Sequence, residues 1–155
     1  MKRVVKIASV ASLYAATTIA LAPISYDVFQ VRIADALMML PSIMGFNAVV
    51  GLAVGCAIAN VASPFGVIDV VFGALTNFLA GLVVYTVARK PTLPRLVLAS
   101  ILSSVVTASI IGYFVLHLIA GVPLLLSLAS VFVGSIISIG ALGVPLATFL
   151  KKVIK

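Results

Sequence analysis

The sequence contains no tryptophan and no glutamate, and its 155 residues include one cysteine, one histidine and three aspartates. A single cysteine excludes an intramolecular disulfide. With one histidine and one thiol, no metal-ligand spacing is present, and no glycine-rich phosphate loop of the Walker A type occurs. No set of nucleophile, base and orienting group can be assigned either. We therefore predict that the chain is not an enzyme, uses no cofactor or metal, and does not itself hydrolyse ATP.

Charge is also scarce. Charged residues make up 8% of the chain and hydrophobic residues 64%, whereas a globular domain has about 25% charged residues. So few charges cannot cover a water-soluble surface, and such hydrophobicity excludes disorder. The net charge is +7, but the basic residues do not form the stripe with interleaved aromatic residues that is typical of a protein binding a nucleic-acid groove. The composition therefore predicts a protein whose solvent is a lipid bilayer.

The long uncharged stretches indicate how often the chain crosses the membrane, because a crossing helix needs about 20 apolar residues. Residues 96–150 must fold back once, at the Gly-Val-Pro break of 121–123, and residues 36–68 are interrupted by Pro41 and Gly45. The first uncharged stretch, residues 7–26, follows three basic residues, as the apolar part of a signal peptide does. We nevertheless expect this helix to be retained in the mature protein. These features predict one all-α integral membrane domain over residues 1–155, a bundle of six transmembrane helices at about 5–22, 33–45, 47–63, 68–88, 96–119 and 125–149. The second crossing is short, so we expect it to be tilted or partly inserted.

The basic residues predict the orientation. Nine of the ten fall into three clusters, and these are Lys2, Arg3 and Lys6; Arg89, Lys90 and Arg95; and Lys151, Lys152 and Lys155. Lys and Arg accumulate in cytoplasmic loops. Six crossings place all three clusters inside, with both termini cytoplasmic and the segments 23–35, 63–69 and 120–124 outside. We expect a multi-pass protein of the cell membrane.

Small residues recur every four positions on several predicted helices. The stripes are Ala8, Ser12, Ala16 and Ala20; Gly51, Gly55 and Ala59; Ser100, Ser104, Ala108 and Gly112; and Ser130, Gly134 and Ser138. Such stripes let helix backbones approach closely in lipid. Packing inside the bundle is the favoured interpretation, and docking onto another membrane subunit is the alternative.

The few polar side chains gather towards the outer face. The segment 23–35 carries Tyr26, Gln30, Arg32 and Asp35, and charges at membrane depth tend to be paired or functional. We predict a binding pocket there, with Asn60, Asp69 and Asn77 as further candidates. Simpler roles are also open. Arg32 and Asp35 have the spacing of a local ion pair, Asn60 and Asn77 have the chemistry for hydrogen bonds between helices, and Asp69 stands where it can cap its own helix.

Several short motifs resemble those of one known family. They are Pro23-Ile24-Ser25-Tyr26, Gln30-Val31-Arg32-Ile33 and Ala36-Leu37, then Gly51-Leu52, Gly55-Cys56-Ala57-Ile58-Ala59-Asn60 and Asp69-Val70-Val71-Phe72-Gly73-Ala74-Leu75. Together they resemble the QueT family, whose members are substrate-binding S components of energy-coupling factor (ECF) transporters. The resemblance covers roughly residues 10–85. This chain departs from the family pattern at Asp27-Val28, where a glycine-proline pair is usual, and at Asp35, where a glutamate is usual.

The resemblance implies a function as well as a fold. A QueT-like S component binds a queuosine precursor, a 7-deazaguanine base, and works with a transmembrane coupling subunit and two ATPase subunits of an ABC importer. In such proteins the first helix commonly offers an Ala-x-x-x-Ala face to the coupling subunit, which corresponds here to Ala11 and Ala15.

The residue chemistry is compatible with such a ligand. A guanine-like edge has adjacent N–H donors and a carbonyl, and we expect Asp35 and Gln30 to recognise it. Tyr26 has the flat ring needed to stack on the base, and Arg32 either orients Asp35 or donates directly. Asp69 and Asn60 are further candidates for contact with the substrate.

Three other functions fit parts of the pattern. The chain has the features of an S component for another vitamin or nucleobase, and the small-residue stripes also suit a ligand-free membrane assembly subunit. An autonomous secondary transporter usually shows inverted repeats, and no convincing repeat relates the two halves of this chain.

Overall fold

The computed structural model describes residues 2–25 and 31–153. These residues fold into helices joined by short turns, and no strand occurs among them. The elements are α1 (Lys2–Ala20), α2 (Ala22–Ser25), η1 (Ile33–Met39), α3 (Pro41–Met44), α4 (Phe46–Asn60), α5 (Gly66–Val87), α6 (Leu93–Thr107), η2 (Ala108–Ile119), α7 (Leu124–Ser135), η3 (Ile136–Gly143) and α8 (Val144–Val153). The elements η1–α3, α6–η2 and α7–η3–α8 each follow one another as one helical segment. The predicted all-α architecture with six apolar helical segments is therefore confirmed.

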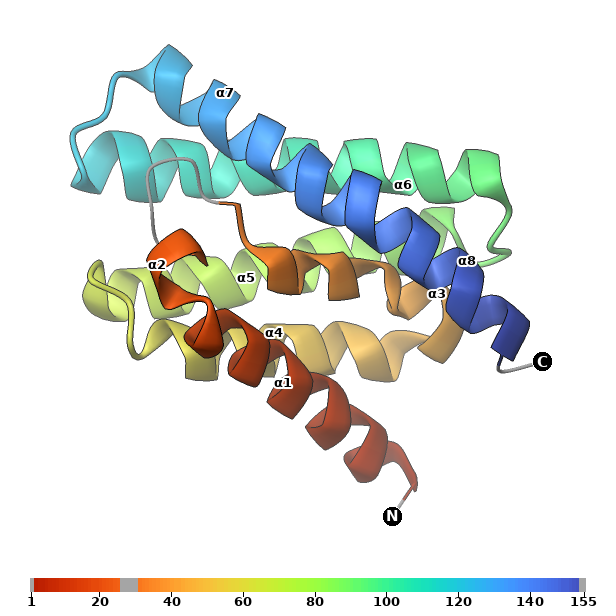
Figure 1. Cartoon of the computed structure of the whole chain (residues 1–155). Coiled ribbons are helices and arrows are strands. Elements are labelled where there is room, and N and C mark those ends of the chain that lie inside the picture. Colours follow the sequence, from red (N-terminus) through yellow and green to blue (C-terminus); the bar gives the residue numbers. More distant parts are fainter. Residues whose placement is uncertain (1, 26–30, 154–155) are drawn as a thin grey trace.

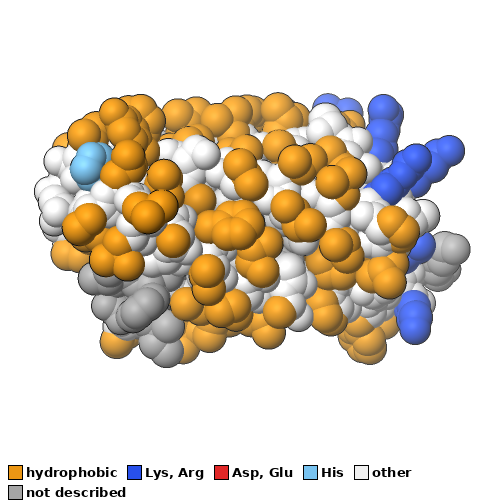
Figure 2. All heavy atoms as spheres, turned by 90° about the horizontal axis from the view of Figure 1, so that it is seen from above, with side chains coloured by type: hydrophobic (Ala, Val, Ile, Leu, Met, Phe, Trp, Pro, Cys, Tyr) orange, Lys and Arg blue, Asp and Glu red, His pale blue; other side chains and the backbone are white. Residues whose placement is uncertain are grey.

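Four of these segments are long and apolar enough to cross a membrane. They are Lys2–Ala20, Gly66–Val87, Leu93–Ile119 and Leu124–Val153. The surface shown in Figure 2 is largely hydrophobic along its length, as expected where lipid replaces water. The described chain thus has the construction of a multi-pass membrane protein.

The two shorter segments lie next to each other in the sequence and are separated by Gly45. Ile33–Met44 and Phe46–Asn60 are apolar but shorter than the other four, and 12 residues of mixed 3₁₀ and α geometry extend only roughly 20 Å. Gly45 adopts φ 73°, a left-handed conformation that favours glycine. Pro41, expected to break the helix, instead stands at the first position of α3, where a proline has no hydrogen bond to lose.

The segment of η1 and α3 runs through the middle of the molecule, between α4 below it and α7 above it in the view of Figure 1. Its residues from Ala34 to Ser42 are all buried, and η1 packs against α1, α5, η3 and α8. The predicted short second crossing is therefore the central helix of the bundle.

The helices α1 and α4 approach each other at glycines. An added Cβ on Gly51 would lie 2.8 Å from Val10 Cβ, and one on Gly55 would lie 2.7 Å from the carbonyl oxygen of Ala11. Those distances leave no room for a side chain. The stripe of small residues on α4 thus packs inside the bundle, as the favoured interpretation predicted.

The same contact changes the expectation for Ala11 and Ala15. They are 4% and 6% exposed, because this side of α1 faces α4. In this structure they are therefore not available for contact with another subunit, and the expectation that they form such a face was wrong. The stripe of small residues that stays exposed on α1 is Ala8, Ser12, Ala16 and Ala20.

Basic side chains gather at one end of the molecule (Figure 2). Both termini and the turn between α5 and α6 lie at this end (Figure 1), and Lys151 Nζ donates a 2.7 Å hydrogen bond to the carbonyl of Pro91. The α4–α5 and α6–α7 turns lie at the opposite end (Figure 1). The three predicted basic clusters are thus close in space, although they come from distant parts of the sequence.

Candidate functional site

A buried tyrosine and a buried aspartate connect α1 to the central helix. Tyr14 Oη donates a 2.6 Å hydrogen bond to Asp35 Oδ1. Tyr14 is fully buried and Asp35 is 5% exposed. Asp35 lies in the first turn of η1, where its backbone N–H donates to the carbonyl of Arg32 at 2.9 Å. The position of this carboxylate is therefore fixed from two sides.

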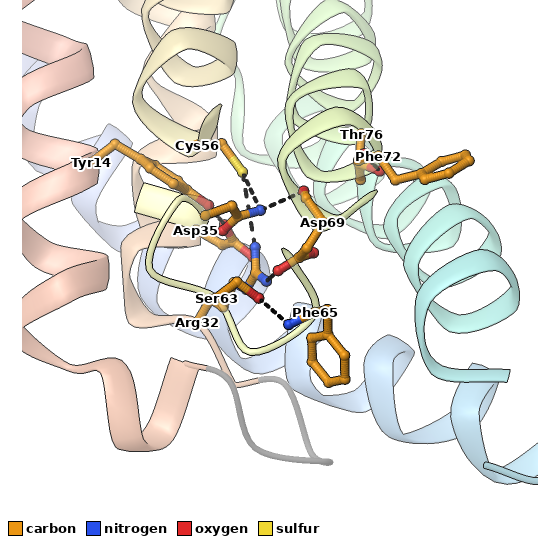
Figure 3. A network of polar contacts seen from close by, with 10 residues as sticks. Tyr14, Arg32, Asp35, Cys56, Ser63, Phe65, Asp69, Phe72 and Thr76 are labelled. Atoms are coloured by element: carbon orange, nitrogen blue, oxygen red, sulfur yellow. Dashed lines mark hydrogen bonds and ion pairs between the residues drawn. The ribbon is translucent and has the colours of Figure 1, made fainter. Parts of the chain in front are cut away.

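A second buried pair joins the central helix to α5. Arg32 Nη2 and Asp69 Oδ2 are 3.3 Å apart, and their side chains are 6% and 0% exposed. Asn60, at the end of α4, donates from Nδ2 to the backbone carbonyl of Asp69 at 2.8 Å and lies 3.5 Å from Cys56 Sγ. Arg32 Nη1 is 3.9 Å from the same sulfur. Figure 3 shows the side chains of Arg32, Cys56 and Asp69 converging beside the α4–α5 turn.

This geometry decides between the interpretations that the sequence left open. The ion pair of Arg32 is formed with Asp69, and Asp35 is bonded to Tyr14 instead, so the simple local pair of Arg32 with Asp35 was wrong. Asp69 lies in the first turn of α5, but its carboxylate is directed to Arg32, and the N-cap of α5 has no side-chain hydrogen bond. Asn60 does bond across to a neighbouring helix, as its simpler role predicted.

Two buried oxygens of this cluster are left without a partner. Asn60 Oδ1 and Asp69 Oδ1 have no hydrogen bond within the described chain. Leaving a buried acceptor unsatisfied costs about 1–3 kcal/mol, and such atoms are rare in folded proteins. These two oxygens can therefore accept hydrogen bonds that the described part of the chain does not supply.

A cavity opens beside Arg32 and Asp35, between η1, α5, α6, η2 and α7. Its lining residues are Arg32, Asp35, Gly73, Thr76, Asn77, Thr107, Ile111, Val131 and Ser135. The cavity has a volume of about 10 Å³, which is close to the minimum for one water molecule. The cavity is thus narrow, and its wall is polar on both the η1 side and the α5–α7 side.

The charge of the buried cluster is unbalanced. Among the residues that the structure describes, the buried charged side chains are Arg32, Asp35 and Asp69. One guanidinium stands against two carboxylates, which leaves an excess of one negative charge when all three are ionised. Uncompensated charge is costly inside a membrane protein, so the second carboxyl group of the cluster is either protonated or meets a cationic or donor-rich group.

The predicted site residues fall into three groups. Arg32 and Asp35 line the cavity, and Asn60 and Asp69 lie behind Arg32 and hold it in place. Tyr26 and Gln30 lie outside the described residues.

The sequence reasoning did not identify Tyr14, Thr76, Thr107 and Ser135, and it named Asn77 only as a further candidate. Tyr14 has a signal that was available, because a tyrosine within an apolar helix needs a partner for its hydroxyl group. The hydroxyl residues have no such signal, since Ser and Thr are also ordinary packing residues in membrane helices.

Comparisons with known proteins agree with this architecture. A family profile described as QueT transporter matches residues 4–152, which is nearly the whole chain. No curated protein sequence and no solved structure matches the chain significantly.

Proposed function

The chain belongs to the QueT transporter family, and on this premise we propose that it is the substrate-binding S component of an ECF-type importer for a queuosine precursor, a 7-deazaguanine base. The observation that carries this proposal is the cavity lined by Arg32 and Asp35, whose side chains are buried at an end of a lipid-facing bundle. Buried ionic groups within apolar helices are costly, and binding of a polar solute is the reason to retain them.

The chemistry of the cavity suits the polar edge of a guanine-like base. The carboxylate of Asp35 accepts from one donor, Tyr14, through Oδ1, and a carboxylate has lone pairs for further N–H donors. Arg32 lines the same cavity and has the donors that a carbonyl oxygen needs. A site built for such groups rejects analogues that lack them, because its own buried groups would be left unpaired.

Asn60 and Asp69 support this site from behind. They hold Arg32 through the ion pair and through the hydrogen bond of Asn60 to the backbone of Asp69. Tyr26 and Gln30 are proposed to complete it by stacking and by amide recognition.

The proposed orientation places both termini in the cytoplasm of a cell-membrane protein. The basic side chains at one end of the molecule support this orientation (Figure 2). The buried cluster that contains Arg32 and Asp69 lies beside the α4–α5 turn, at the end of the molecule opposite the basic side chains (Figure 1, Figure 3). A solute would then enter from outside.

The proposed partners are a transmembrane coupling subunit and two ATPase subunits. The chain has no phosphate-binding loop of its own, so the energy for release must come from elsewhere. We place the coupling contact on the exposed small-residue stripe of α1, Ala8, Ser12, Ala16 and Ala20, because small residues permit close helix approach in lipid.

A binding titration on the purified protein in detergent or nanodiscs tests the proposed function. Ligands should include 7-deazaguanine bases, with guanine, thiamin, riboflavin and biotin as competitors. The proposal expects saturable binding of the 7-deazaguanines that the others do not displace at similar concentrations. Preferential binding of one of the vitamins or of guanine would make the chain an S component for that compound. Absence of binding to every compound would favour a ligand-free assembly subunit.

A further inference from the structure

A groove lies on the side of the bundle, between α6 and the segment formed by η3 and α8. Its volume is about 350 Å³, which falls within the range of about 300–1,000 Å³ that is usual for ligand pockets. Its rims are Val97 and Ile101 of α6 and Ile137 of η3, which are 43%, 42% and 43% exposed. This groove, which we call the side groove, therefore opens towards the lipid.

Small residues form the floor of the side groove. A Cβ added to Gly140 would lie 3.6 Å from Ser100 Oγ, so little side-chain volume separates the two helices here. Ser100 Oγ donates to the carbonyl of Val97 at 2.8 Å, and its proton is thereby committed to its own helix. The other residues that line the groove are apolar. The surface of the groove thus suits a hydrocarbon chain, which makes van der Waals contacts and no hydrogen bonds.

Two lysines stand beyond one end of the side groove. Val144 lines the groove at the start of α8, and Lys151 follows it by about two helical turns on the same face, roughly 10 Å further along the axis. Lys151 Nζ donates at 2.7 Å to the carbonyl of Pro91, in the turn that precedes α6. An ammonium group has three donors, so two remain, and Lys152 beside it is exposed.

The positive charge of these lysines is not compensated by the acidic residues that the structure describes. Asp35 and Asp69 are buried, and they are bonded to Tyr14 and Arg32. Further basic side chains gather at the same end of the molecule as the lysines (Figure 2). A basic patch at the end of a groove between transmembrane helices is an arrangement that binds phospholipid head groups. The charge of this end therefore complements an anionic lipid.

We propose that the side groove, Lys151 and Lys152 form a binding site for an anionic phospholipid, with one acyl chain in the groove and the phosphate bound by the two lysines. The acyl chain contacts both α6 and η3, which pack against each other, and the head group lies where the end of α8 meets the turn before α6. The bound lipid thus holds the last two helical segments together. This site is separate from the polar cavity beside Arg32 and does not depend on which solute the protein binds.

Native mass spectrometry of the full-length protein in detergent tests the head-group contact. The probes are dioleoyl phosphatidylglycerol, which is anionic, and dioleoyl phosphatidylcholine, which has the same acyl chains and no net charge. The wild-type protein should bind the first phosphatidylglycerol molecule about tenfold or more tightly, because each lysine near the head group favours an anionic lipid. Replacing both lysines, Lys151→Gln with Lys152→Gln, should remove most of this preference. Lys151→Arg with Lys152→Arg keeps the charges and should retain it.

Arg95→Gln is the matched control for the loss of charge. Arg95 is exposed at the same end, but it stands about 200° around α6 from Val97 and so faces away from the side groove. Its replacement should leave the lipid preference unchanged. Lys152→Gln alone is a further variant if the double replacement does not fold, since Lys152 is exposed, and it should reduce the preference several-fold.

Filling the side groove tests the acyl-chain contact. Ala141 lines the groove, so Ala141→Phe should weaken phosphatidylglycerol binding several-fold while keeping the surface apolar. Leu142→Phe is the control, because Leu142 is 43% exposed and does not line the groove. Equal effects of the two substitutions would overturn the acyl-chain contact.

Three other results would overturn the proposal. Equal affinity of the wild type for the two lipids would show that the groove holds ordinary bulk lipid. Displacement of phosphatidylglycerol by glycerol phosphate at the same concentration would show that the head group binds without the chain. A dimer that Ala141→Phe dissociates would assign the groove to a second copy of the protein.

Discussion

Tyr14 and Asp35 form a 2.6 Å hydrogen bond across 21 positions of the sequence. Both residues are buried, and the bond fixes the first helix to the start of the central helix. Because Asp35 lines the cavity, the packing of α1 is linked directly to the geometry of the candidate site. Changes in α1 should therefore alter binding as well as stability.

Tyr14→Phe tests this link. The substitution removes the donor and keeps the ring, so the buried carboxylate of Asp35 loses one of its hydrogen bonds. We expect a loss of about 1.5–3 kcal/mol in the free energy of unfolding, together with weaker binding of the ligand. Thermal unfolding in detergent and a binding titration measure the two effects. Tyr113→Phe is the control, since Tyr113 is 40% exposed, and an equal effect in both variants would contradict the link.

Replacing one partner of the ion pair between Arg32 and Asp69 should lower the free energy of unfolding more than replacing both partners together. Asp69→Asn leaves a guanidinium buried beside a neutral amide, and removal of one partner of a buried pair typically costs about 3–5 kcal/mol. Adding Arg32→Gln to Asp69→Asn should recover part of that loss. A double-mutant cycle of unfolding free energies measures the coupling.

Additive effects of the two substitutions would contradict a direct interaction of Arg32 with Asp69. Arg95→Gln, at an exposed position of the basic end, should be nearly neutral in the same assay.

Gly73 is required for the position of Asn60. A Cβ at Gly73 would lie 2.2 Å from Asn60 Nδ2, so Gly73→Ala should displace the amide that donates to the carbonyl of Asp69. We expect weaker ligand binding and a lower melting temperature. Gly140→Ala is the control, because its added Cβ would be no closer than 3.6 Å to a neighbour. Similar melting temperatures for Gly73→Ala and wild type would show that Asn60 has room to move.

Gly55 controls the distance between α1 and α4. An added Cβ would lie 2.7 Å from the carbonyl oxygen of Ala11, which is backbone and cannot rotate away. Gly55→Ala should therefore separate the helices, draw Tyr14 away from Asp35 and destabilise the protein by about 1–3 kcal/mol. Gly81→Ala, with its nearest neighbour at 3.5 Å, should be tolerated. Thermal unfolding compares the two variants, and equal stability would contradict the close approach.

The helical architecture was predictable because lipid imposes strong rules. Backbone N–H and C=O groups in a bilayer must form hydrogen bonds within their own helix. The long uncharged stretches of the sequence therefore predict the positions of the helical segments. The break at Gly45 was also predictable, since glycine readily adopts the left-handed conformation found there. The continuation of the helix through Pro41 was not, because it depends on a change from 3₁₀ to α geometry at that residue.

The candidate site was predictable only in part. Arg32, Asp35, Asn60 and Asp69 stand out as polar residues in an apolar chain, and the structure buries all four. Their pairing was not predictable, because Arg32 and Asp69 are 37 positions apart and meet only through the packing of η1 on α5.

The sequence spacing of the small residues in α1 likewise could not predict which face of this helix stays exposed. The stripe that begins at Ala8 and the pair of Ala11 and Ala15 both repeat every four residues. The sequence therefore offers two small-residue faces of the same period, and only the packing of α4 on α1 decides which of them stays exposed.

The most direct test of the central claim is the affinity of Asp35→Asn for the 7-deazaguanine base that binds the wild-type protein most tightly. Asparagine has nearly the same shape but replaces one acceptor oxygen with a donor and removes the charge. The account predicts a loss of affinity of about tenfold or more in an isothermal titration, with partial recovery in Asp35→Glu, which restores the carboxylate. Unchanged affinity in a folded Asp35→Asn protein would contradict it and place the ligand elsewhere.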